Sequence, residues 1–60
     1  MLERLRIMKL IISYQDGSTE IIAVARCDYM EFKSDCIVIE YAAGNTQYVQ
    51  YRDIRSIVIA

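Results

Sequence analysis

Residues 8–25 read MKLIISYQDGSTEIIAVA, and this stretch decides the fold. Aliphatic and β-branched residues stand on both sides of Asp16-Gly17, a dipeptide typical of a two-residue type I′ turn because both residues accept a positive φ. Residues that favour strands on either side of such a turn indicate an antiparallel hairpin. Its strands carry more aliphatic side chains than one buried face requires.

The two-residue turn also predicts which side chains share a face of this hairpin. It places Ile12 opposite Ile21 on the core side, and Ile11 opposite Ile22 on the outer side. The outer side is then too apolar for a face that only meets water. We therefore expect it to contact a partner or a second copy of the chain.

The second strand of this hairpin continues far beyond residue 25, and its apolar positions change parity on the way. A strand with a period of two residues accommodates such a change only through an extra residue, which predicts a bulge or sharp bend in residues 27–29. The next turn signal, Ser34-Asp35, places Phe32 opposite Ile37 in a second hairpin.

Two loop lengths compete for the third hairpin, around Gly44-Asn45. A two-residue loop sets Ile37 opposite Arg52, whereas a three-residue loop over 43–45 sets it opposite Tyr51. The longer loop keeps the core apolar and is the one we expect.

The final segment has Ile54 and Ile57 three residues apart and then resumes an alternating pattern, which predicts one helical turn before the last strand. Residues 1–60 are thus expected to form a single all-β domain. Its five antiparallel strands, in meander order, are expected to close into a small barrel.

Composition excludes several classes of function. The chain of 60 residues has seven basic and eight acidic residues, so it lacks the basic excess of general nucleic-acid binders. It has no histidine, which leaves cysteine and serine nucleophiles without their commonest base. Two cysteines without histidine do not fill a zinc shell, and Cys27 and Cys36 are expected to be buried or half-buried thiols. We expect no enzymatic activity, no cofactor and no metal.

The expected architecture resembles small SH3-like and Sm-like barrels over most of the chain. Tyr51-Arg52, followed by the apolar strand 56–58, is similar to the second Sm motif, although Asp53 stands where that family has glycine or histidine. The resemblance implies an oligomeric protein that binds single-stranded RNA through Tyr51, Arg52 and Arg55.

A looser resemblance concerns size, acidity and the Asp-Gly-Ser hairpin. In these respects the chain is similar to small accessory proteins of phages and mobile elements, such as anti-CRISPR proteins. This resemblance implies an inhibitor that blocks a host defence nuclease by covering its surface.

The residues themselves favour a non-enzymatic protein-binding module that also self-associates. Exposed tyrosines are enriched at protein interfaces, and an exposed apolar face is typical of a surface that binds another protein. The predicted protein interface comprises Ile7, Ile11, Ile22, Val24, Tyr29 and Tyr48. Three carboxylates, Asp28, Glu31 and Glu40, are expected to gather on one outer face as a solvated rim. The alternatives are the RNA-binding protein described above and a structural subunit of a larger assembly.

The longest purely aliphatic run, residues 21–25, is far shorter than a membrane span. The apolar stretch of residues 10–12 is likewise too short for the core of a signal peptide. The expected location is therefore the cytoplasm, with no membrane partner.

Overall fold

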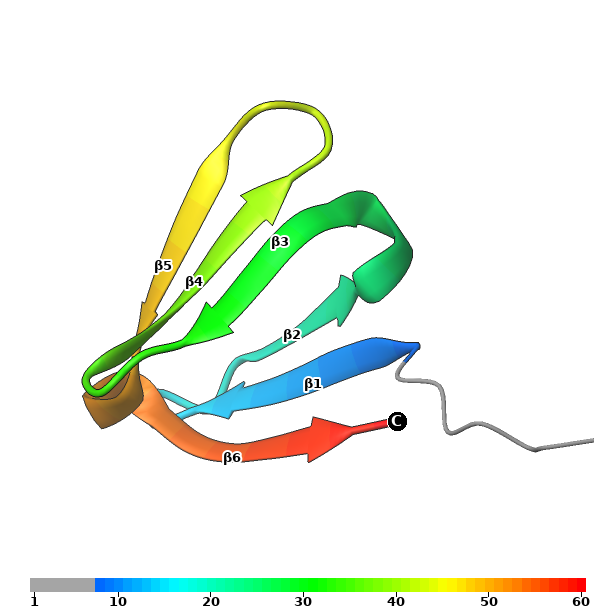
Figure 1. Cartoon of the computed structure of the whole chain (residues 1–60). Coiled ribbons are helices and arrows are strands. Elements are labelled where there is room, and N and C mark those ends of the chain that lie inside the picture. The colour runs from blue at the N-terminus through cyan, green and yellow to red at the C-terminus, as the bar shows by residue number, and fades with distance from the viewer. Residues whose placement is uncertain (1–7) are drawn as a thin grey trace, which may run out of the picture.

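The computed structural model describes residues 8–60, and within them the chain forms six strands and two short 3-10 turns (Figure 1). The strands are β1 (Lys9–Tyr14), β2 (Thr19–Ala23), β3 (Cys27–Phe32), β4 (Cys36–Tyr41), β5 (Thr46–Gln50) and β6 (Ile54–Ile59). The turns are η1 (Val24–Arg26), which joins β2 to β3, and η2 (Tyr51–Asp53), which joins β5 to β6. A helical turn does precede the last strand, but it lies at 51–53, before the predicted position: Ile54 and Ile57 both belong to β6, and their spacing of three residues comes from a register shift between β1 and β6.

The strands form two separate antiparallel sheets of three strands each, in the orders β2-β1-β6 and β3-β4-β5 (Figure 1). The all-β class is confirmed, but the predicted closed five-stranded barrel is wrong. The expected long second strand is divided by η1, so its halves belong to different sheets. No strand pairing joins the two sheets in residues 8–60, so each sheet keeps two free edges.

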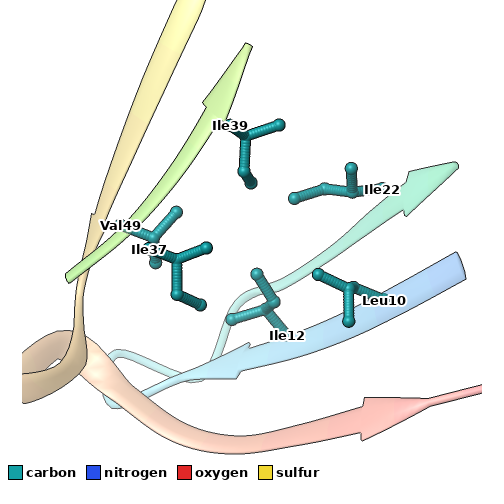
Figure 2. Close-up of a cluster of buried hydrophobic side chains, with 6 residues drawn as sticks. All are labelled: Leu10, Ile12, Ile22, Ile37, Ile39 and Val49. Carbon is teal, nitrogen blue, oxygen red and sulfur yellow. The ribbon is translucent and has the colours of Figure 1, made fainter. Parts of the chain in front are cut away.

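The core lies between the facing sides of the two sheets. Ile12, Ile37 and Ile39 have no exposed surface, and each such burial stabilises a small domain by about 1.5–3 kcal/mol. Figure 2 shows these side chains pointing from both sheets into the shared space. The complete cluster is Leu10, Ile12, Ile22, Ile37, Ile39 and Val49.

The first hairpin differs from its predicted register by one residue. Ile11 lies opposite Ile21, and Leu10 lies opposite Ile22. Since neighbouring strand residues point to opposite faces, this slip exchanges the two isoleucines of β2. Ile22 lies in the core at 3% exposure, and Ile21 faces outward at 63%.

The cause is the turn at Gln15–Gly17, which has three residues rather than two. Gly17 adopts φ +94° but Asp16 does not have a positive φ, so the turn is not type I′. The Asp16 Oδ1 accepts hydrogen bonds from the Ser18 backbone nitrogen (2.9 Å) and hydroxyl (2.6 Å), and these bonds lower the pKa of Asp16. The carboxylate thereby holds the longer turn that sets the register.

The second hairpin matches the prediction: Phe32 lies opposite Ile37. The predicted irregularity in residues 27–29 is also confirmed, because the register shifts between Cys27 and Tyr29. This bulge follows η1 directly, and together they turn the chain from the first sheet into the second.

The third hairpin has a three-residue loop, as predicted, but it lies one residue earlier, over 42–44, with Gly44 at φ +107°. Ile37 therefore pairs with Val49 rather than with Tyr51, which corrects the predicted register by two residues. A two-residue shift preserves the faces of a strand, so the core remains apolar as expected.

Candidate binding surfaces

The outer face of the second sheet brings two exposed tyrosines together with two carboxylates. Tyr29 is 48% exposed and Tyr48 is 65% exposed, whereas Val38 between their strands is buried at 8%. These side chains border an open hollow of about 510 Å³. We call this surface the acidic–aromatic face; its residues are Tyr29, Glu31, Lys33, Val38, Glu40 and Tyr48.

The strand register explains why these side chains meet. Val38 of β4 lies opposite Glu31 on one side and opposite Tyr48 on the other, so the three form one row across the sheet. Tyr29 lies opposite Glu40 in the adjacent row. The face therefore combines aromatic rings, an aliphatic floor and negative charge within two rows of the pleated surface.

A hydrogen bond orders part of this face. The Tyr29 hydroxyl donates to Glu31 Oε1 at 2.5 Å. This bond, followed by burial and the charges of Glu31 and Glu40, raises the pKa of Tyr29. The phenol remains neutral and its ring has a defined orientation beside the carboxylates.

The outer face of the first sheet carries a row of aliphatic side chains across all three strands. Ile11 lies opposite Ile21 on β2 and opposite Val58 on β6, and the two flanking residues are 63% and 51% exposed. We call these three residues the apolar row. The neighbouring rows carry small or polar side chains and Lys9, which is the one charged residue among the nine paired outward positions: Lys9, Ile11, Ser13, Thr19, Ile21, Ala23, Ser56, Val58 and Ala60. The exposed Arg55 lies beside them, at the register shift of β6.

The predicted interface residues are distributed over several places. Ile22 lies in the core and is not at the surface, because the register differs from the expected one. Ile11 is half-buried in the apolar row, and Val24 is half-buried on η1. Ile7 lies outside the described residues. Sequence reasoning missed Ile21, whose outward direction depends on the three-residue turn, and Val58, whose place beside Ile11 depends on the pairing of β6 with β1.

The predicted RNA-binding residues lie on or next to η2. Tyr51 is half-buried, packs against the core, and donates a hydrogen bond from its hydroxyl to the Lys33 carbonyl at 2.8 Å. Arg52 and Arg55 are exposed. Because its ring packs against the core, Tyr51 offers less surface for base stacking than an exposed tyrosine does.

The two thiols are free and lie in different surroundings. Burial raises the pKa of Cys27, which is half-buried, and that of Cys36, to which the neighbouring Asp35 also contributes. A raised pKa keeps a thiol protonated, and a protonated thiol is a poor nucleophile. Within residues 8–60, no three side chains of the metal-ligating types gather closely enough to hold an ion.

A polar network between the two sheets was not predicted. The Glu20 carboxylate of β2 accepts hydrogen bonds from the Tyr14 hydroxyl (2.6 Å) and from the Gln47 amide nitrogen of β5 (3.0 and 3.1 Å). The Tyr41 hydroxyl donates to the Gln47 amide oxygen, which fixes the orientation of that amide. Burial raises the pKa of both tyrosines, so both hydroxyls stay protonated and act as donors.

In the part of the chain that the structure describes, no helix has the length and apolarity needed to cross a lipid bilayer.

No model of a protein family, no curated protein and no solved structure matches this chain. The likeness to Sm-like and anti-CRISPR proteins therefore stays a prediction, and the functional interpretation depends on the surfaces themselves.

Proposed function

We propose that this protein is a non-enzymatic protein-binding module that holds an arginine-rich segment of a partner on its acidic–aromatic face. The observation that carries the proposal is the juxtaposition of exposed Tyr29 and Tyr48 with Glu31 and Glu40 over the buried Val38. An arginine guanidinium stacks on an aromatic ring and also pairs with carboxylates, so one side chain satisfies both halves of the face.

Charge on this face favours a basic partner over an acidic one. Glu31 and Glu40 outnumber Lys33, and tyrosine rings present a negative surface to a cation. Proteins that grip nucleic-acid phosphates expose arginine and lysine, so their basic grooves are partners of the required chemistry. Inhibition of a host defence nuclease is a narrower form of the same proposal.

Loss of the Tyr48 ring should weaken binding of a basic probe. The probe is a short fluorescent peptide with several arginines in a glycine–serine background, and fluorescence anisotropy measures its affinity. We expect Tyr48→Ala to weaken binding about tenfold, because an arginine–ring contact contributes on the order of 1 kcal/mol and the carboxylates lose a neighbour that excludes water.

The matched control compares two single charge neutralisations. Glu40→Gln on the face should weaken the same peptide, whereas Asp53→Asn, on η2, should leave its affinity within about twofold. Equal effects of the two substitutions would show that net charge alone attracts the peptide and would refute a defined site.

A second candidate function, self-association, rests on the apolar row. Three strands present Ile11, Ile21 and Val58 in a row that holds no charged residue, and depletion of charge is typical of the centre of an interface. A second copy fits because two such faces stack as sheets do in a sandwich, about 10 Å apart.

The two exposed members of the row provide the test. The double variant Ile21→Glu with Val58→Glu should stay folded, because both side chains are more than half exposed, and should be monomeric where the parent is a dimer. Sedimentation velocity measures the state. Thr19→Glu, on the same face but outside the row, should not change it. A parent that is monomeric at high concentration contradicts self-association.

A further inference from the structure

The two sheets leave a cavity of about 220 Å³ where β3 of the second sheet faces the end of β6 in the first. Its floor is Leu10, which is 1% exposed and belongs to the core. Most of its walls are apolar side chains, among them Val24, Met30, Phe32 and Ile59. The cavity is therefore a lateral extension of the core that the chain's described residues do not fill.

Two large side chains at this cavity face inward but remain uncovered. Phe32 lies opposite Ile37, and Ile59 lies opposite Leu10, so both point to the core side of their sheets. They are nevertheless 51% and 55% exposed, because β3 and β6 are edge strands that no ladder joins. Burial of this apolar surface by an incoming group would be favourable.

The size of the cavity limits what it holds. Sites for drug-sized ligands and cofactors occupy about 300–1,000 Å³, which exceeds this volume. An apolar cavity of about 150 Å³ already accepts a benzene ring. The cavity of about 220 Å³ therefore matches one side chain with an aromatic ring rather than a cofactor.

The surroundings of the cavity indicate what accompanies that side chain. Tyr29 borders this cavity and also the acidic–aromatic face, so the two sites adjoin along β3. Asp28, exposed at the bulge, adds a carboxylate to the cavity lining. Negative charge therefore lies next to the cavity, at Asp28 and on the acidic–aromatic face. This charge favours a partner segment that carries basic residues beside the apolar side chain it inserts.

We propose that the cavity between β3 and β6 is an anchor pocket, and that the partner segment inserts one aromatic side chain into it while its neighbouring arginines lie on the acidic–aromatic face. This inference rests on the proposed function, because it extends the same partner across Tyr29. It gives the partner a two-part motif, in which an aromatic anchor supplies burial and arginines supply charge.

Two peptide probes test the anchor. The first carries one phenylalanine and two arginines in a glycine–serine background, in a series in which the spacing between them varies. The second replaces the phenylalanine with alanine. We expect the best phenylalanine probe to bind at least about tenfold more tightly than its alanine counterpart, as anchors that fill pockets do.

Methyl NMR locates the bound ring in the full chain. The Met30 methyl lines the cavity and should shift with the phenylalanine probe but much less with the alanine probe. The Met8 methyl, which is 63% exposed and does not line the cavity, is the internal control and should not distinguish the probes. A Met30 shift that follows protein concentration without peptide would assign the cavity to a second copy and overturn the proposal.

A matched pair of variants separates this inference from the proposed function. Ile59→Ala should weaken the phenylalanine probe about three- to fivefold and leave the alanine probe unchanged, whereas Ser56→Ala, on the opposite face of the same strand and outside the cavity, should affect neither. Equal affinities of the two probes overturn the anchor pocket even if Glu40→Gln still weakens binding. Conversely, a Met30 shift that persists while Glu40→Gln has no effect refutes the basic site and leaves the pocket.

Discussion

Ile22→Ala should lower the free energy of unfolding by about 3 kcal/mol, whereas Ile21→Ala should change it by less than about 1 kcal/mol. The two residues are neighbours of the same type on β2, but Ile22 is 3% exposed in the core and Ile21 is 63% exposed on the outer face. Truncation of the buried side chain removes its transfer free energy and leaves a cavity, while truncation of the exposed one does neither.

Urea denaturation followed by circular dichroism measures both variants. A domain of this length has a total stability of about 3–9 kcal/mol, so Ile22→Ala is expected to leave a substantial unfolded fraction in buffer. Ile22→Val, which removes one methyl group, should cost about 1 kcal/mol and keeps the comparison measurable. If Ile21→Ala proved to be the more damaging change, the register with a two-residue turn would be the correct one.

Glu20→Ala should destabilise the protein by about 2 kcal/mol. The substitution leaves the Tyr14 hydroxyl and the Gln47 amide without their acceptor. Loss of a charged acceptor costs about 1.5–3 kcal/mol when its donors are buried, and partial exposure of these groups reduces that cost. Chemical denaturation measures the change.

Glu20→Gln is the matched control, because its amide oxygen still accepts a hydrogen bond from the Tyr14 hydroxyl. We expect it to lower the free energy of unfolding by about half as much as Glu20→Ala does. A double-mutant cycle with Tyr14→Phe isolates the contact, and we expect a coupling of about 1 kcal/mol between the two residues. Additive effects of the two substitutions would contradict a shared hydrogen bond.

Local turn chemistry determined how much of this fold the sequence predicts. The Ser34-Asp35 hairpin was predicted correctly because a two-residue loop between two apolar strands permits one register with an apolar core face. The register of the hairpin at Gly17 was predicted wrongly, because the Asp16 carboxylate accepts hydrogen bonds from Ser18 and the turn is one residue longer than expected. A Gly-containing turn is compatible with both lengths, and side-chain hydrogen bonds decide between them.

The pattern of residues could not predict whether the strands close into a barrel or form two separate sheets. The alternation of residues in a strand identifies its faces but not whether its free edge meets another strand. That depends on how far η1 and η2 turn the chain, which is a property of the whole backbone.

The sequence predicted the candidate surfaces only where it also predicted the strand register correctly. Tyr29 and Tyr48 were predicted to point outward, and both do, because the second sheet kept its faces. The outward positions of Ile21 and Val58 were missed, because the first hairpin exchanged the faces of β2 and because only the pairing of β6 with β1 places Val58 beside Ile11. The Glu20 network joins residues from four strands and both sheets, so no local pattern indicates it.

The pairing of β1 with β6 has a mechanical consequence. The two strands are antiparallel, and Leu10 at the start of β1 lies beside Ile59 at the end of β6. A tensile force applied at these two points would load the inter-strand bonds one after another, like a zipper, instead of all together in shear. Such a ladder yields at low force, so the first sheet would open from that end while the hairpin of β1 and β2 still holds.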